Sequence, residues 1–180
     1  MRELTDRERV VEFIRLVGRA ARSAARVYFT GGSTAVVYGW RESTIDIDVR
    51  FAPELDEIYR ALSSIKEKLR VNVELASPPD FIPEVPGWED RSIFITREGP
   101  VDFFHFDPYS QVLSKLQRSH EKDLADANSM YEAGLIDLAR LSEYFDRIRP
   151  QMYKYPVIDP DDFERSVDSF IQRHKQKRAE

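Results

Sequence analysis

The chain lacks cysteine entirely, so it contains no disulfide framework and no thiolate metal site. It also lacks any apolar run close to the roughly 20 residues that a transmembrane helix requires. Its first residues are too highly charged for a secretory signal peptide. Only three histidines are present, and no two have the spacing of metal ligands, so we do not expect a histidine metal site. These absences favour a cytoplasmic protein with no membrane partner.

The length and composition of the chain predict one folded domain with a small additional segment. Of the 180 residues, 42% are hydrophobic and 12% aromatic, which suffices for a core. Charged residues make up 33%, so we expect a highly charged surface. The net charge of −5 argues against a general nucleic-acid coat protein, but it leaves room for a local basic patch.

Hydrophobic periodicity predicts a mixed strand and helix region followed by helices alone. The expected strands are 27–30, 45–51, 71–75, 92–96 and 101–106, and the expected helices are 6–23, 33–38, 53–69, 108–118, 121–133, 137–148 and 161–175. This order predicts an α/β (α+β) fold, with a small mixed sheet and flanking helices. We expect residues 1–108 to form the core and residues 109–180 to form a C-terminal helical subdomain packed on it.

Two features lie close together in the first half of the chain. Gly31, Gly32 and Ser33 form a turn after an apolar strand, and Ser33 is placed to cap the next helix. A glycine turn that opens a helix offers free backbone N–H groups to a phosphate. Asp46 and Asp48 then share one face of a strand, where two carboxylates repel each other unless a divalent cation joins them. Phosphate and metal together indicate phosphoryl or nucleotidyl transfer.

A simpler interpretation of the same acids stays open. Asp46 can cap the loop that precedes its strand, and Asp48 can pair with an arginine such as Arg41 or Arg50. In that case the two carboxylates are structural and bind no metal.

The stretch from Phe29 to Val49, with Gly-Gly-Ser followed twelve residues later by Asp-Ile-Asp-Val, resembles the polymerase-β-like nucleotidyltransferase superfamily. It looks most like the branch that contains AbiEii-type toxins and uncharacterised bacterial and archaeal members. The later stretch Val112 to Asp126 is also similar to that branch, which often carries Lys-Leu, Arg and Asp-x-x-Asp there. The resemblance covers about residues 27–148.

The resemblance implies a nucleotidyltransferase fold and a mechanism with two Mg²⁺ ions, in which a hydroxyl attacks the α-phosphorus of an NTP. Asp46 and Asp48 would hold the metals. The Gly31–Gly32 turn and Ser33 would bind the phosphates through backbone N–H groups and the hydroxyl.

Members of the family usually add a third carboxylate on a later strand. Glu74 follows the helix after the Asp-x-Asp strand, which is the expected order, and we assign it as the third metal ligand. Asp102, in a similar apolar setting on a later strand, is the alternative. If neither acid serves, the site is incomplete and inactive.

Basic residues near these motifs are candidates for phosphate contacts. Arg41 precedes the acidic strand and can contact the triphosphate or neutralise Asp46. Lys115 is the best candidate on the first predicted C-terminal helix, where it shares a face with Arg118 and Lys122. The alternative is a solvated basic stripe paired with Glu121 or Asp126. Asp123 and Asp126 can themselves pair with Lys122 and Arg118.

The sequence therefore predicts a Mg²⁺-dependent enzyme that moves a nucleoside monophosphate from an NTP such as ATP to a hydroxyl. The branch implies tRNA or a protein as acceptor, and a toxin that has a cognate antitoxin. One rival is a silent relative that only binds a nucleotide or a protein partner. Another is a small-molecule adenylyltransferase of the aminoglycoside kind, which would need a deep acidic pocket.

Overall fold

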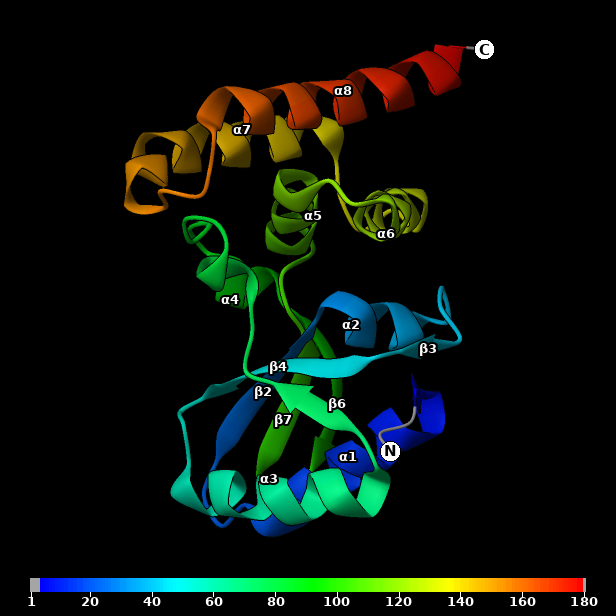
Figure 1. Cartoon of the computed structure of the whole chain (residues 1–180), viewed down its shortest axis with the longest axis vertical. Coiled ribbons are helices and arrows are strands. Elements are labelled where there is room, and N and C mark those ends of the chain that lie inside the picture. Colours follow the sequence, from blue (N-terminus) through cyan, green and yellow to red (C-terminus); the bar gives the residue numbers. More distant parts are fainter. Residues whose placement is uncertain (1–3, 180) are drawn as a thin grey trace. The chain divides into compact units, whose positions relative to one another are not determined.

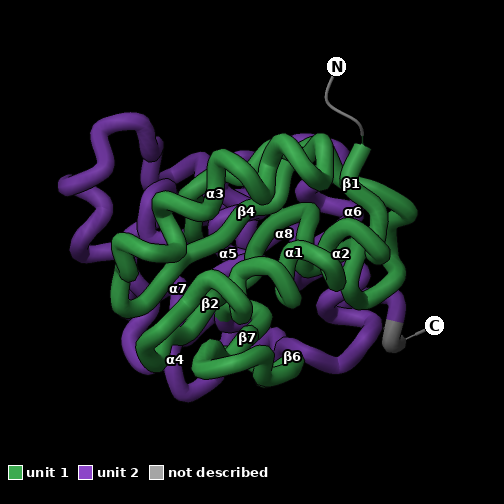
Figure 2. The backbone as a smooth tube through the Cα atoms, turned by 90° about the horizontal axis from the view of Figure 1, so that it is seen from below, with its two compact units in different colours: residues 1–77, 92–106 green, residues 78–91, 107–180 purple. Residues whose placement is uncertain are grey.

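The computed structural model describes residues 4–179, with side chains described for residues 4–177. The chain divides into two compact units, shown in separate colours in Figure 2. Unit 1 comprises residues 1–77 and 92–106, and unit 2 comprises residues 78–91 and 107–180. The segment 78–91, which the sequence analysis assigned to the core, groups with the C-terminal helices.

Unit 1 contains three helices and two sheets among its described residues. The helices are α1 (Arg7–Ala20), α2 (Gly31–Tyr38) and α3 (Asp56–Leu69). The strands are β1 (Thr5–Asp6), β2 (Ala25–Thr30), β3 (Ser43–Thr44), β4 (Asp46–Ala52), β5 (Asn72–Glu74), β6 (Ile93–Glu98) and β7 (Val101–His105). The predicted mixed α/β class is confirmed.

The main sheet has five strands in the order β5-β4-β2-β7-β6, and β1 pairs with β3 in a separate ribbon. Strand β2 runs antiparallel to β4 and parallel to β7, whereas β5 runs parallel to β4. The β6–β7 hairpin, predicted from the sequence, is antiparallel and contains a register shift between Phe94 and Thr96. This order makes β4, with the acidic motif, a direct neighbour of both β2 and β5.

One face of the main sheet is covered by α1 and α3, which pack side by side (Figure 1). Both helices have apolar residues at the three- and four-residue spacing that places them on one side. The buried cluster draws on α1, α3 and alternate strand positions, and its members include Val10, Phe13, Val17, Ile58, Leu62, Val27, Phe29, Ile47, Val49 and Phe103. Because side chains alternate along a strand, the residues between these positions lie on the opposite face.

Two glycines let α1 approach the β6–β7 turn closely. A Cβ atom on Gly18 would lie 2.5 Å from the carbonyl oxygen of Glu98, and one on Gly99 would lie 2.7 Å from the carbonyl oxygen of Gly18. Gly99 also has a φ of +57°, which favours glycine. Larger side chains at either position would push the helix away from the hairpin.

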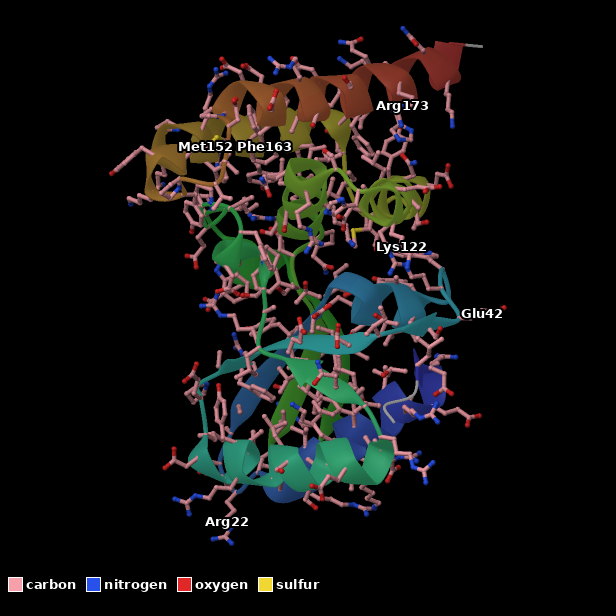
Figure 3. All side chains as sticks on the ribbon, viewed as in Figure 1. Arg22, Glu42, Lys122, Met152, Phe163 and Arg173 are labelled. Atoms are coloured by element: carbon pink, nitrogen blue, oxygen red, sulfur yellow. The ribbon has the colours of Figure 1, made fainter. Side chains whose placement is uncertain are left out.

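Unit 2 is helical throughout its described part. Its helices are α4 (Trp88–Arg91), α5 (Pro108–Arg118), α6 (Glu121–Glu132), α7 (Leu138–Ile148) and α8 (Pro160–Ala179), with short 3₁₀ segments η1 (Pro78–Asp80) and η2 (Arg149–Lys154). Met152 and Phe163, labelled in Figure 3, are both buried, and Phe163 packs edge-on against Phe145 with ring centres 5.0 Å apart. Unit 2 thus has an apolar core of its own.

The start of α2 differs from the prediction. The helix begins at Gly31 with Thr30 as the preceding cap residue, so Ser33 lies inside the first turn and is not the N-cap. Gly39 ends the helix in the left-handed conformation, as predicted. Gly31, the first residue of the helix, has a positive φ of 58°, a conformation that glycine adopts without strain.

Within residues 4–179, none of the helices combines the length and the apolar character that a bilayer crossing demands.

Candidate functional site

The Gly-Gly turn connects β2 to α2 and lies against the acidic strand. A Cβ atom built on Gly31 would stand 2.5 Å from Oδ2 of Asp48. On Gly32, it would collide with the hydroxyl of Thr44 and lie 3.5 Å from Nη1 of Arg41. Gly31 also has a φ of +58°, which favours glycine, and at Gly32 the side chain of Thr44 occupies the place where a side chain would begin. The structure brings together the turn, Asp48 and Arg41, which the sequence had singled out separately.

Ser33 links the turn to the acidic strand through its side chain. Its hydroxyl oxygen accepts a hydrogen bond of 3.1 Å from the backbone N–H of Asp48, and the residue is fully buried. The predicted role of Ser33 as a phosphate ligand stays a prediction. What its side chain does in the structure is to fix the backbone of Asp48 relative to the first turn of α2.

Asp46 is held by a residue that the sequence analysis missed. Nδ2 of Asn72, on β5, donates a 2.7 Å hydrogen bond to Oδ1 of Asp46. Within residues 4–177 no arginine or lysine is bonded to Asp46, and the interpretation of this acid as a cap of the preceding loop stays a prediction. The only sequence signal for Asn72 was its place on a short strand beside the acidic one.

The alternation of β4 confirms that the two acids share a face. Ile47 and Val49 are buried in the core, whereas Asp46 and Asp48 are half-buried on the other side. In the parallel register of β4 and β5, Asp46 lies opposite Asn72 and Asp48 lies opposite Glu74. Paired residues point to the same side of a sheet.

Glu74 therefore extends the acidic face by one strand. Its side chain is exposed, and Nδ2 of Asn72 lies 3.5 Å from its Oε1. The structure places Glu74 on the same face as the Asp pair, although its role as a third ligand stays a prediction.

Asp102, the alternative third carboxylate, lies elsewhere on the sheet. It pairs with Arg26 of β2, whereas Asp48 pairs with Thr30, four residues further along. At about 3.3 Å per residue this is a separation of about 13 Å along the strand. Arg97 holds Asp102 with two hydrogen bonds of 2.6 and 2.8 Å, and this pairing lowers the pKa of the Asp102 carboxyl. Asp102 thus has a local ion-pair role in the hairpin.

Asp46 and Asp48 are the two residues whose side chains are suited to bind a cation. Asp46 and Asp48 offer carboxylate oxygens, which are the ligands that Mg²⁺ prefers, from neighbouring positions on one face. In the part of the chain with described side chains, no three histidine or acidic groups gather tightly enough to hold a metal. Water or a nucleotide's phosphate oxygens would complete the coordination, as they commonly do for Mg²⁺.

Lys115 lies in unit 2 and is engaged there. Its Nζ donates to Oδ2 of Asp126 at 2.5 Å and lies 3.6 Å from Oδ1 of Asp123. The lysine and both acids are buried, with exposed fractions of 3%, 2% and 7%. The expected pairing of Arg118 with an aspartate is confirmed, at 2.8 Å to Asp123. The phosphate contact assigned to Lys115 stays a prediction, and its observed role is that of a buried ion-pair partner.

His105 was not predicted to matter and lies at the end of β7 inside unit 1. Its Nδ1 is 3.2 Å from the hydroxyl of Thr34, and that hydroxyl donates to the carbonyl oxygen of Phe29. Burial lowers the pKa of His105 to about 4, so the ring is neutral at pH 7 and stacks on Tyr38. His105 therefore contacts α2 through Thr34 and Tyr38, in the part of the helix that follows the two glycines.

Of three comparisons with known proteins, one gives a match. None of the curated proteins and none of the solved structures compared with the chain matches it. One family model, described as nucleotidyltransferase of unknown function (DUF6036), matches residues 7–175, which is nearly the whole chain. The chain therefore belongs to this family of nucleotidyltransferases.

Proposed function

We propose that the protein is a Mg²⁺-dependent nucleotidyltransferase that moves a nucleoside monophosphate from an NTP to a hydroxyl group. The observation that carries the proposal is the contact between the acidic strand and the glycine turn, where Oδ2 of Asp48 lies against Gly31. The first turn of a helix and a carboxylate beside it suit a phosphate and its cation. Membership of a nucleotidyltransferase family supports the same chemistry.

In the proposed reaction, the acceptor hydroxyl oxygen forms a bond to the α-phosphorus. The bond between that phosphorus and the oxygen that bridges to the β-phosphorus breaks, and pyrophosphate leaves with the electron pair. A base takes the hydroxyl proton, and Glu74, exposed on the acidic face, is our candidate. Mg²⁺, when bound by Asp46 and Asp48, supplies charge neutralisation at the phosphates.

The remaining parts of the site orient the nucleotide. The backbone N–H groups at Gly32 and Ser33 can bind phosphate oxygens, and Arg41, whose guanidinium approaches Gly32, adds positive charge. Ser33 keeps Asp48 in register with that turn. Placement of the phosphates beside the acids is the main contribution of the protein, because the chemistry requires no covalent intermediate.

For the acceptor and the biological setting, we propose tRNA or a protein as acceptor and a toxin role countered by a cognate antitoxin, in a cytoplasmic protein. These finer assignments rest on the resemblance to the AbiEii-type branch. The alternative acceptor is a cationic small molecule, as in adenylyltransferases of the aminoglycoside kind. An assay that supplies such a molecule as acceptor tests this alternative.

The test is incubation with Mg²⁺ and each α-labelled NTP, with and without total tRNA and cell protein. We expect label transfer by the wild type and at least a hundredfold loss in Asp48→Ala. Asp56→Ala removes an exposed acid of unit 1 that faces Arg60 at 3.8 Å, and it serves as the matched control with unchanged transfer. Equal transfer by Asp48→Ala and the wild type would show that the active site lies elsewhere.

The second candidate function is nucleotide binding without transfer. It is favoured by one observation, the lack of a three-acid cluster in the part of the chain with described side chains. A silent relative would bind Mg²⁺ and ATP in calorimetry, would lose this binding in Asp48→Ala, and would label no acceptor.

A further inference from the structure

Asn72 lies between two carboxylates of different strands. Its Nδ2 is 2.7 Å from Oδ1 of Asp46 on β4 and 3.5 Å from Oε1 of Glu74 on its own strand. The first distance is that of a strong hydrogen bond and the second is at the limit of a weak one. The register of the two strands places Asn72 directly opposite Asp46.

An amide differs from a cationic partner in what it does to a carboxylate. A lysine or arginine would neutralise Asp46 and compete with a cation for its charge. The Asn72 amide fixes the direction of the carboxylate through one oxygen and leaves the negative charge in place. Such neutral hydrogen bonds are the usual means by which the ligands of a metal site are oriented.

We propose that Asn72 is a positioning residue that orients Asp46 for the cation, so that the site is built by β5 as well as by β4. This inference rests on the proposed function. Ser33, on α2, fixes the backbone of Asp48 by accepting from its N–H, whereas Asn72, on β5, bonds the carboxylate of Asp46 directly.

The test is a titration of the purified full chain with Mn²⁺, in which the free ion is followed by electron paramagnetic resonance. We expect Asn72→Ala to weaken Mn²⁺ binding about tenfold, as loss of a partner that orients a metal ligand commonly does. In an Asp46→Asn background the same substitution should change the affinity less than twofold, because the group that it orients is gone. With NTP as substrate, kcat should fall about tenfold while KM for the NTP stays within twofold.

The control is Asn128→Ala, which removes a 2.8 Å hydrogen bond to His174 in unit 2 and should leave Mn²⁺ binding unchanged. Wild-type affinity in Asn72→Ala would overturn the inference, as would an equal loss in the Asp46→Asn background. If Asp46→Asn and Asp48→Ala bind Mn²⁺ as the wild type does, the metal site itself is wrong and both proposals fall. Thermal unfolding of each variant, measured in parallel, separates a loss of binding from a loss of fold.

Discussion

The two units treat charge in opposite ways. In the described part of unit 2, three carboxylates and one lysine are buried, and each meets a partner of opposite charge: Asp107, Asp123, Asp126 and Lys115. In the described part of unit 1 no carboxylate, lysine or arginine is buried, and the acids of the candidate site are half-buried or exposed. Acidic and basic residues are equal in number in unit 1, so the net charge of −5 belongs to unit 2.

Buried ion pairs stabilise the fold of unit 2, whereas the partly exposed acids of unit 1 are accessible to a ligand. A buried pair such as Lys115 and Asp126 is compensated within the protein, and removing one member takes away a buried opposite charge. Among residues 4–177, Asp46 is bonded only to a neutral amide, which does not neutralise a carboxylate. The proposed metal chemistry therefore belongs to unit 1.

The largest effect is expected from the buried pair of unit 2. Lys115→Met should lower the free energy of unfolding by about 3–5 kcal/mol, because buried Asp126 loses the positive charge 2.5 Å away. The measurement is urea unfolding at pH 7. The double variant Lys115→Met/Asp126→Leu should recover most of the loss, since both charges are then removed.

The same variants address the phosphate contact predicted for Lys115. If the double variant is stable and retains wild-type KM for the NTP, Lys115 has a structural role only. A KM raised tenfold or more in a stable double variant would instead support the phosphate contact.

The next effect concerns a buried group of unit 1 that carries no charge at neutral pH. Burial lowers the pKa of His105 to about 4, against about 6.5 in the unfolded chain. Below pH 6.5 the unfolded state therefore binds more protons, so stability falls as the pH drops from 6.5 to 4. At 1.36 kcal/mol per pKa unit the loss is about 3 kcal/mol.

The measurement for His105 is urea unfolding at several pH values between 7 and 4. His105→Gln should flatten the pH dependence in this interval, whatever its effect on stability at pH 7. The same steep acid loss in His105→Gln and the wild type would show that another group is responsible.

A smaller effect should come from the contact between α1 and the β6–β7 hairpin. Gly18→Ala places a methyl group 2.5 Å from the carbonyl oxygen of Glu98, which the backbone can relieve only by moving. We expect a destabilisation of about 1–3 kcal/mol, despite the higher helix propensity of alanine. Thermal unfolding measures the loss of stability. Gly134→Ala is the comparison variant, because nothing lies within 4 Å of its Cβ position and any loss there comes from the positive φ of residue 134 and not from a clash.

The smallest effect should come from the exposed ion pair of unit 1. Arg97→Ala breaks the pair with Asp102 at the surface, and we expect the free energy of unfolding, measured with urea, to fall by less than about 1 kcal/mol.

The choice between the two candidates for the third carboxylate is tested by activity. Asp102→Asn should leave nucleotide transfer within twofold of the wild type, whereas Glu74→Gln should lower it at least tenfold. The reverse pattern would make Asp102 the third carboxylate after all.

The sequence was informative wherever local pattern decides structure. The longer helices, the hairpin and the mixed fold class follow from periodicity and turn residues, and Gly39 ends α2 where expected. The short helix α4 and the β1–β3 ribbon were not predicted. It was less informative where the contact is made between distant segments. The burial of Lys115, the start of α2 at Gly31 and the amide of Asn72 beside Asp46 depend on neighbours that no local pattern specifies.

By itself, the sequence determined that Asp46 and Asp48 share a face, because the strand period of two separates them from Ile47 and Val49 whatever the strand's neighbours are. Only the tertiary structure decided what stands beside them. The strand order β5-β4-β2-β7-β6 brings Asn72 and Glu74 next to the acids and leaves Asp102 near the other end of β2. The physical reason is that strand order and register follow from burying the whole apolar face against α1 and α3, a condition that no single segment encodes.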